Sequence, residues 1–438
     1  MKIGKVYQNK NWLVCSILLL SVLLLSSVCA ACAQPAAVPN EVSKGFQTVK
    51  PEAVGLSSER LDQIDSVLQA DMEGGKINGA VLLVAREGKI AYFKSFGYRD
   101  KEKTLPMEKD SIFRVYSMTK SITAVAVAML MQEGKLALAD PVEKYIPSFK
   151  NIQVGEVNKD ETGKDVVTMV KPSNVMTIQD LCRHTSGLSY WFFPPTAIQA
   201  LYLQAGMNNL EELTNAEVCE KLATLPLVEN PGTKYRYGMS YDVLGRVIEV
   251  ISGMTLDKFF EERIYKPLEM KDSGFQVTGT DVERLVYLDQ WALYIDPTSP
   301  TRKYWSGGGG TVSTAMDFAR FAQMLLNGGQ LEGKRLLEPR TVAFITSDQL
   351  GPMGNRDDAL YMPGRGYGVG FDFYVRVDTG SANFPANVGE FSKGGAAGTV
   401  YWVDPKEDLV AVFVVSAPTY REHYRNLIET MIYQAIAN

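Results

Sequence analysis

Histidine is nearly absent from this 438-residue chain, which contains only His184 and His423. Neither belongs to an H-x-H or H-E-x-x-H motif, from which zinc enzymes usually take their ligands. The chain also lacks a basic run or an arginine-rich stripe, and its net charge is −5. These absences argue against a zinc catalyst and against nucleic-acid binding. We expect neither a metal nor a cofactor.

Cysteine is also scarce, and three of the five cysteines lie within the first 33 residues. Two of these three, Cys29 and Cys32, form a C-x-x-C pair, which is a weak metal or redox signal in such a segment. The other two are Cys182 and Cys219. One disulfide in an oxidising compartment is one interpretation of them. The interpretation that we favour makes each a small buried apolar residue.

The N-terminus has the pattern of an export signal. Three lysines precede the apolar run WLVCSILLLSVLLLSSVCAACAQ, and no charged residue occurs between positions 11 and 40. Cleavage before Gln34 and lipid attachment at Cys32 both fit this pattern, and so does an uncleaved anchor. We therefore expect residues 1–33 to be a signal peptide or lipoprotein signal and 34–50 a linker. The protein would be exported, as a periplasmic protein or an outer-membrane lipoprotein attached to the membrane through its N-terminus.

The rest of the chain predicts an α+β protein. Both ends combine helices with strand-like runs, whereas the middle is mainly helical and contains a polar insertion, 151–170, that we expect to be a surface hairpin. No internal repeat indicates a solenoid. We predict an α/β sheet lobe from residues 51–115 and 300–438, and a mainly helical lobe from residues 116–299. Predicted helices span 56–75, 177–188, 240–252, 314–329 and 422–436.

The stretch YSMTKSITAVAVAMLMQEG predicts a further helix, buried on every side and ended by Gly134. Ser117 and Lys120 lie three residues apart at its start and would share one face. A serine there can be acylated, with its own N–H holding the oxyanion, and a desolvated lysine can act as a base. The alternative is a serine cap beside a lysine that reaches solvent.

Several stretches, taken in order, resemble the serine β-lactamase-like superfamily. The similarity is to the group of class C β-lactamases, D-alanyl-D-alanine carboxypeptidases and family VIII carboxylesterases, and it runs from about residue 51 to the C-terminus. The resemblance implies a β-lactamase/transpeptidase-like fold, an antiparallel sheet flanked by helices, with the active site beside a helical lobe. The stretches are GAVLLVAREGKIAY, FRVYSMTKSITAVA, LALADPVEKYIP, LCRHTSGL, PGTKYRYGMSYDVLG, GGGGTVSTAMDFARFAQMLLNGG and GGAAGTVYWVDP.

The resemblance implies a role for particular residues. Ser117 and Lys120 match the nucleophile and lysine of the family, and Tyr237 matches its tyrosine, a general base whose pKa the lysine lowers. Lys393-Gly394-Gly395 matches the strand that lines the cleft, and the N–H of Ala396 would complete the oxyanion hole with that of Ser117.

Departures from the family pattern favour the esterase branch. Met239 stands where β-lactamases and carboxypeptidases have the asparagine that holds a substrate amide. Gly394 replaces the Thr or Ser that binds their substrate carboxylate. Lys393 stands where esterases of the group often have tryptophan, and we expect it to attract an anionic group of the substrate.

Other motifs near the predicted cleft are less specific. Trp191 and Phe192 lie in the aromatic segment 189–203, which suits either a wall over an apolar substrate group or a cluster inside the helical lobe. His184 should hold the turn after its helix. The run GGGG at 307–310 lacks the Lys-Ser/Thr of a phosphate loop and predicts a tight turn.

We therefore predict an exported serine hydrolase that forms an acyl-serine intermediate, with carboxylesterase as the preferred activity. Its partner would be a small-molecule ester or amide. The alternatives are acyl transfer to an alcohol acceptor, a β-lactamase or D-alanyl-D-alanine carboxypeptidase, and a non-catalytic envelope binding module. The substrate-binding residues would be Met239, Lys393, Gly394, Gly395, Trp191 and Phe192.

Overall fold

The computed structural model describes residues 46–193, 196–288, 296–351 and 364–437. The chain from Ser43 onward forms one compact unit. The predicted signal, 1–33, and most of the predicted linker, 34–50, lie outside the described residues. Among the described residues, which begin at position 46, no helix has both the length and the apolar character that crossing a bilayer requires.

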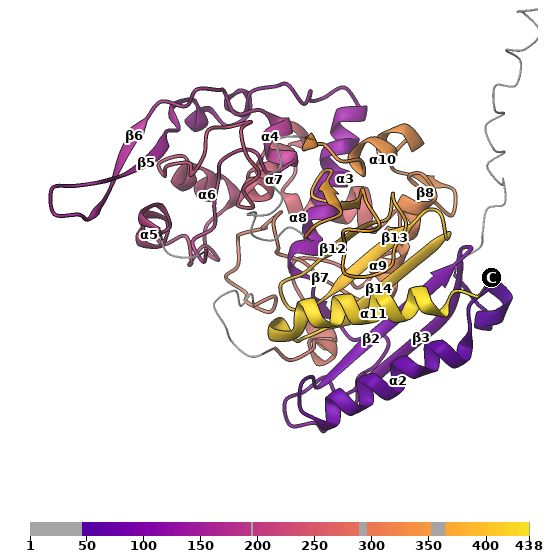
Figure 1. The fold of residues 1–438 in the computed structure, drawn as a ribbon. Helices are drawn as coiled ribbons and strands as arrows, with labels where there is room; N and C mark the ends of the chain where they lie inside the picture. The colour runs from indigo at the N-terminus through magenta and orange to yellow at the C-terminus, as the bar shows by residue number, and fades with distance from the viewer. Residues whose placement is uncertain (1–45, 194–195, 289–295, 352–363, 438) are drawn as a thin grey trace, which may run out of the picture. The chain divides into compact units, whose positions relative to one another are not determined.

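An eight-stranded sheet takes its strands from both ends of the chain (Figure 1). Neighbouring strands pair antiparallel, as predicted, except at the edge, where the two-residue strand β1 pairs with β3 in parallel. In spatial order the strands are β1 (Gln47–Thr48), β3 (Lys89–Gly97), β2 (Gly79–Arg86), β14 (Leu409–Val415), β13 (Val400–Asp404), β12 (Phe391–Gly394), β11 (Tyr374–Arg376) and β10 (Tyr367–Val369).

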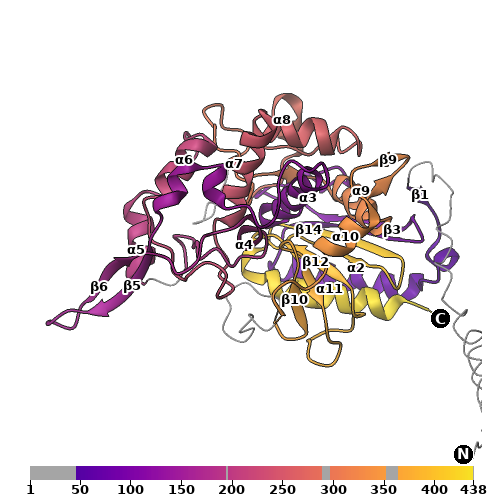
Figure 2. The same cartoon turned by 90° about the horizontal axis from the view of Figure 1, so that it is seen from above.

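The central strands β2 and β14 are buried on both faces, which explains their unbroken apolar sequences. Successive side chains of a strand point to opposite faces. On one face, Leu82 and Phe413 pack under α2 (Ser58–Glu73) and α11 (Arg421–Ala435). On the other, Leu83 and Val412 belong to the core that includes α3 (Thr119–Gln132) and α9 (Ala315–Leu326). Figure 2 shows these two helical layers with the sheet between them.

The helix that carries the S-x-x-K motif, α3, is buried on all sides along most of its length, as predicted. It ends before Gly134, whose φ of 69° is the left-handed conformation that glycine adopts at low cost. α3 packs against α7 and α10, and the 3₁₀ turn Tyr116–Met118 that precedes it contacts β12. The other helices are α4 (Ile178–Cys182), α5 (Ala197–Gln204), α6 (Asn215–Leu222), α7 (Ser240–Ser252), α8 (Leu256–Phe260) and α10 (Pro339–Ile345).

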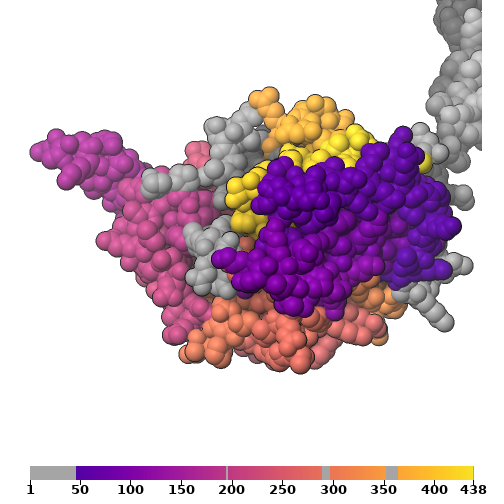
Figure 3. Space-filling model, turned by 90° about the horizontal axis from the view of Figure 1, so that it is seen from below, coloured from indigo at the N-terminus to yellow at the C-terminus, as the bar shows by residue number. Residues whose placement is uncertain are grey.

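The polar insertion forms the hairpin of β5 (Val154–Lys159) and β6 (Asp165–Val170), which confirms that prediction. It projects from the body in Figure 3, and most of its side chains are exposed. Two short strand pairs lie outside the main sheet, β4 (Phe113–Arg114) with β7 (Val312–Ser313) and β8 (Gln330–Leu331) with β9 (Lys334–Arg335), and isolated bridges join other segments. The division into two lobes stays a prediction.

The helix predicted over 177–188 is shorter than expected. Thr177 and Asp180 form a capping box at its start, but α4 ends at Cys182. His184 has a φ of 58°, a left-handed conformation that ends the helix. Cys182 and Cys219 are both buried and unpaired, as we favoured from the sequence.

Candidate active site

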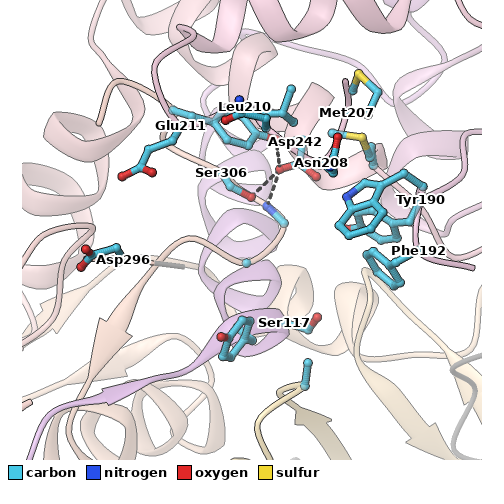
Figure 4. Close-up of a pocket in the computed structure, with 18 of the residues that line it drawn as sticks. Ser117, Tyr190, Phe192, Met207, Asn208, Leu210, Glu211, Asp242, Asp296 and Ser306 are labelled. Carbon is cyan, nitrogen blue, oxygen red and sulfur yellow. Dashed lines mark hydrogen bonds between the residues drawn. The ribbon is translucent and has the colours of Figure 1, made fainter. Parts of the chain in front are cut away.

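The chain reaches Ser117 through a strained turn. β4 leads into a 3₁₀ turn, Tyr116–Met118, and α3 starts at Thr119, two residues after the serine that we expected at the start of the helix. Tyr116 has a φ of 45°, which is rare for a bulky side chain. Residues in such conformations cluster at functional sites, where the surrounding packing holds them in place. The turn presents Ser117 at the amino end of α3 (Figure 4).

Lys120 lies beside Ser117 as the spacing predicted, with its Nζ 3.2 Å from Ser117 Oγ. The side chain has no exposed surface, so it does not reach solvent. Its Nζ donates to the carbonyl of Gly308 over 2.5 Å. Burial lowers the pKa of Lys120, although the charges of Asp372 and Asp242 oppose this shift. A lysine in this setting can be a neutral amine that accepts a proton.

Tyr237 meets Ser117 from a segment 120 residues away, and its hydroxyl donates to Ser117 Oγ over 2.7 Å. Burial raises the pKa of Tyr237 well above its usual value, and the negative charge of Asp372 adds to this. That direction is opposite to the one that the family resemblance implied. In the resting site Tyr237 is therefore a phenol, and Lys120 is the better proton acceptor.

A loop of four glycines holds the lysine. Gly308 accepts from Lys120, and its N–H donates to Asp242 Oδ1 over 3.3 Å. A Cβ on Gly308 would lie 2.4 Å from Asp242 Oδ2, so only glycine fits there. Asp242 also accepts from Tyr304 and from Ser306 at 2.6 and 2.5 Å. The GGGG run is thus a turn, as predicted, but sequence reasoning missed that it positions Lys120.

Ser117 lies at the edge of a cavity of about 460 Å³ (Figure 4). Trp191, Phe192 and Met239 line this cavity, which places three predicted substrate-binding residues at it. Tyr190, whose ring stacks on Phe192 at 4.7 Å between centroids, extends the aromatic wall. The opposite wall is polar and includes Glu211, Asp242, Asp296, Tyr304 and Ser306. The cavity can hold an amphipathic group of drug-like size.

A smaller cavity of about 70 Å³ also borders Ser117 and Tyr237. Gly394, Gly395 and Ala396 line it at the end of β12, and Ala396 lines the larger cavity as well. A Cβ on Gly395 would lie 2.4 Å from the carbonyl oxygen of Val115, so a glycine is needed for the strand to pass this close. Ala396 therefore lies where its N–H can serve the predicted oxyanion hole.

Lys393 does not lie where we expected a substrate-binding residue. Its side chain has no exposed surface, and its Nζ donates to Asp372 Oδ1 over 2.6 Å. An ammonium paired in this way behind the cleft has no surface with which to attract a substrate anion. The same Asp372 Oδ1 lies 3.0 Å from His184 Nε2. Sequence reasoning missed Asp372, since no local motif marks it.

The described residues contain no group of three or more His, Cys, Asp or Glu side chains arranged to hold a metal ion. The site itself offers a hydroxyl in contact with an amine and a phenol.

Comparison with known proteins places the chain in a family. Residues 64–430 match the family model described as Beta-lactamase. The chain belongs to the β-lactamase family. This β-lactamase-family chain has the predicted fold, and in general terms it is a serine hydrolase.

Three proteins illustrate what this β-lactamase-family chain is similar to. Protein Rv1367c of Mycobacterium tuberculosis is 32% identical over 367 residues, which cover 81% of this chain and 90% of that protein. Esterase EstB of Burkholderia gladioli is 28% identical over 384 residues, covering 82% and 91%. The solved structure of EstCE1, a hydrolase with promiscuous acyltransferase activity, has a TM-score of 0.72 and 26% identity, covering 85% and 98%.

Proposed function

We propose that this protein is a carboxylesterase that works through an acyl-Ser117 intermediate. The observation that carries the proposal is the position of Ser117 Oγ, 3.2 Å from Lys120 Nζ and 2.7 Å from the Tyr237 hydroxyl. A nucleophile in contact with both a proton acceptor and a proton donor is equipped for covalent catalysis. The adjoining cavity provides room for the acid or the alcohol of an ester.

Acylation follows from the protonation states of the site. Ser117 gives its proton to the neutral Lys120 amine as Oγ bonds to the ester carbonyl carbon. The N–H groups of Ser117 and Ala396 hold the oxyanion, and each such donor is worth about 3 kcal/mol in other enzymes. When the carbon–oxygen bond to the alcohol breaks, Tyr237 protonates the departing oxygen. The Lys120 ammonium then returns a proton to Tyr237.

Deacylation is the reverse sequence with water in place of the alcohol. Tyr237 first passes its proton to Lys120 and then accepts a proton from the attacking water. The Lys120 ammonium reprotonates Ser117 Oγ as the acid leaves. Tyr237 therefore acts as the acid toward the alcohol and as the base toward water, and no cofactor is required.

The lining of the cavities favours esters over lactams and peptides. Met239 offers no amide group for a substrate amide, and Gly394 offers no hydroxyl for a carboxylate. Lys393 is committed to Asp372. The absence of these partners costs an ester little binding free energy, because an ester has no amide N–H and does not need a carboxylate for recognition. The 28% identity to esterase EstB supports the same choice.

Acyl transfer is the second candidate. The aromatic wall of the larger cavity would exclude water from an acyl-enzyme and admit an alcohol acceptor. The similarity to EstCE1, whose description includes promiscuous acyltransferase activity, favours it too. β-Lactamase and D-alanyl-D-alanine carboxypeptidase activity are weaker alternatives, and a non-catalytic binding module is the alternative of another class.

A substrate panel tests the preference. We expect a p-nitrophenyl ester to be turned over at least ~10-fold faster, by kcat/KM, than a chromogenic cephalosporin or a D-Ala-D-Ala peptide, since each missing polar partner costs about 1–3 kcal/mol. Preference for the cephalosporin or the peptide would contradict the esterase proposal. Added alcohol that diverts product from acid to ester would establish acyl transfer, whereas acid as the sole product would remove it.

We propose that the protein is exported, because its N-terminus combines lysines with a long apolar run that ends in small residues. Expressed in a bacterium with an outer membrane, it should be found in the periplasm or the outer membrane. The mass of the mature N-terminus separates the alternatives: Gln34 first indicates a cleaved signal, and a diacylated Cys32 indicates a lipoprotein. An intact N-terminus in the cytoplasmic fraction would contradict export.

A further inference from the structure

The larger cavity beside Ser117 carries more negative than positive charge. Of the described residues that line it, three are carboxylates, Glu211, Asp242 and Asp296, and one is a cation, Arg302. The Arg302 guanidinium is turned to the main chain, where it donates to three backbone carbonyls over 2.7, 2.8 and 3.2 Å. Three negative charges and one positive charge leave the lining with a formal charge of −2.

Glu211 presents a carboxylate that no described residue satisfies. No hydrogen bond or ion pair reaches its side chain from the described part of the chain, and its Oε1 is buried. The main chain at this point is fixed, since the carbonyl of Glu211 accepts from the N–H groups of Lys303 and Tyr304 over 2.8 and 3.1 Å. Figure 4 shows Glu211 on the wall of the cavity. A buried carboxylate oxygen without a partner costs free energy, which a donor or a cation on a bound ligand would recover.

Asp242 adds a second oxygen of this kind. The residue is only 4% exposed, and its Oδ1 accepts all three of the hydrogen bonds described above. Its Oδ2 accepts none from the described residues. A nearly buried carboxylate with one oxygen fully bonded and the other not is able to accept from a ligand in the cavity.

Aromatic rings form the other side of the cavity. Tyr190 and Phe192 lie across it from Glu211 (Figure 4). Trp191 lines the cavity as well, and its ring meets that of Phe192 edge to face at 5.6 Å between centroids. The faces of such rings attract a cation, and tryptophan does so most strongly. The cavity therefore combines carboxylates with aromatic rings, the two kinds of group that bind an ammonium.

These features exclude an anion and favour a cation over a neutral group. An anion would meet charges of its own sign. A neutral hydroxyl could donate to Glu211 but would gain neither the attraction of the net charge nor that of the ring faces. Both attractions are stronger in a cavity that is shielded from water. The larger cavity thus suits a positively charged group with an apolar surface, such as a substituted ammonium.

We propose that the ester cleaved at Ser117 carries an ammonium group, which binds in the larger cavity between the Glu211 carboxylate and the ring of Trp191. The proposal rests on the proposed function and names its class of substrate. The ammonium belongs to the acid or to the alcohol of the ester. The chemistry at Ser117 is the same in both cases, since water converts the ester into an acid and an alcohol.

The experiment compares esters that have the same shape and differ in a quaternary nitrogen against a quaternary carbon. For the acid side, the pair is the p-nitrophenyl esters of 4-(trimethylammonio)butanoate and 5,5-dimethylhexanoate. For the alcohol side, the pair is the acetates of choline and 3,3-dimethylbutanol. Because a positive charge also makes an ester more reactive by itself, each kcat/KM is divided by the rate constant for hydrolysis of that ester by hydroxide.

We expect wild type to favour the cationic ester by at least ~10-fold in one of the two pairs, the scale of a desolvated contact between a cation and a ring. The pair that shows the preference identifies the side of the ester that fills the cavity. Equal or faster turnover of the carbon ester in both pairs would overturn the proposal, since an apolar cavity without a cation site favours the neutral group.

Two variants test the two sides of the cavity. Glu211→Gln removes the charge at nearly constant shape, and Trp191→Leu removes the ring while keeping the wall apolar. Each should lower the cationic preference ~3–10-fold. Glu212→Gln is the matched control, because Glu212 is the next residue but is exposed and does not line the cavity. The readout is the ratio within a pair, because a purely structural defect slows both esters alike.

A cationic preference that folded Glu211→Gln keeps in full would also overturn the proposal. Melting temperature reports folding, and if Glu211→Gln does not fold, the wild-type ratio and Trp191→Leu decide in its place. If wild type cleaves none of the four esters and is not labelled by a fluorophosphonate, the proposed function itself fails. If wild type is labelled but shows no cationic preference, the class of substrate alone fails.

Discussion

Ser117→Ala should lose all labelling by a fluorophosphonate and ester turnover by on the order of 10⁵–10⁶-fold, the loss seen when a serine nucleophile is removed from other enzymes. The reason is that Lys120 and Tyr237 both act through Ser117 Oγ, the atom that they contact at 3.2 and 2.7 Å. Without that oxygen no acyl-enzyme forms, so Lys120 has no serine proton to accept and Tyr237 has no departing alcohol to protonate. Mass spectrometry of the labelled protein should place the adduct on Ser117.

Ser252→Ala is the matched control for this change. Ser252 is the last residue of α7, a helix whose first turn carries Asp242 at the larger cavity, so it lies about 15 Å along the helix from the site. Its variant should label and turn over substrate as wild type does. Labelling of Ser117→Ala at the wild-type rate would remove Ser117 as the nucleophile. Failure of wild type and variant alike to react would favour the non-catalytic binding module.

Lys120→Met should slow acylation by ~10³–10⁴-fold while the protein stays folded, since general-base help is worth about 10²–10⁴ and the nucleophile depends on it. Methionine fills the space of the lysine stem but accepts no proton. The acid limb of the pH profile should disappear as well. In wild type, acylation falls as pH drops through the lowered pKa of Lys120, because the ammonium cannot accept the serine proton.

Lys135→Met controls for the loss of a lysine near the same helix. Lys135 follows the carboxyl end of α3, pairs with Glu133 and has half of its side chain exposed, at 50%. Its variant should keep the wild-type rate and pH profile. Lys120→Met acylating within ~3-fold of wild type would remove Lys120 from the mechanism, since general-base help is worth far more.

The geometry of contacts between residues a few positions apart in the chain could be predicted from the sequence. Ser117 and Lys120 are three residues apart, and the helical repeat brings such residues to one face whatever surrounds them. The capping box of Thr177 and Asp180 follows from the same local rule. Strand-like runs predicted strands at both ends of the chain, and the hairpin at 151–170 was predicted from its polar insertion.

Contacts between distant segments needed the family resemblance or were missed. The resemblance supplied Tyr237 but implied a lowered pKa for it, which was wrong. Burial raises the pKa of this tyrosine and favours the neutral phenol. Lys393 was wrongly predicted to bind the substrate, because a lysine in the motif that lines the cleft is expected to point into the cleft. Its partner Asp372 could not be found, because nothing in the local sequence marks one carboxylate among 50 acidic residues as buried.

The amino-acid order alone thus specifies the strands, the buried helix and the pairing of a serine with a lysine, because these follow from side-chain periodicity over a few residues. Only the tertiary structure determines which charged side chains are buried next to one another. Asp372 lies 188 residues from His184 and 21 from Lys393, and these three groups, once buried beside Tyr237, set the charge near its ring. The strength of an interaction between two charges depends on their burial and on the distance between them. Local secondary-structure propensity determines neither quantity for residues far apart in the chain.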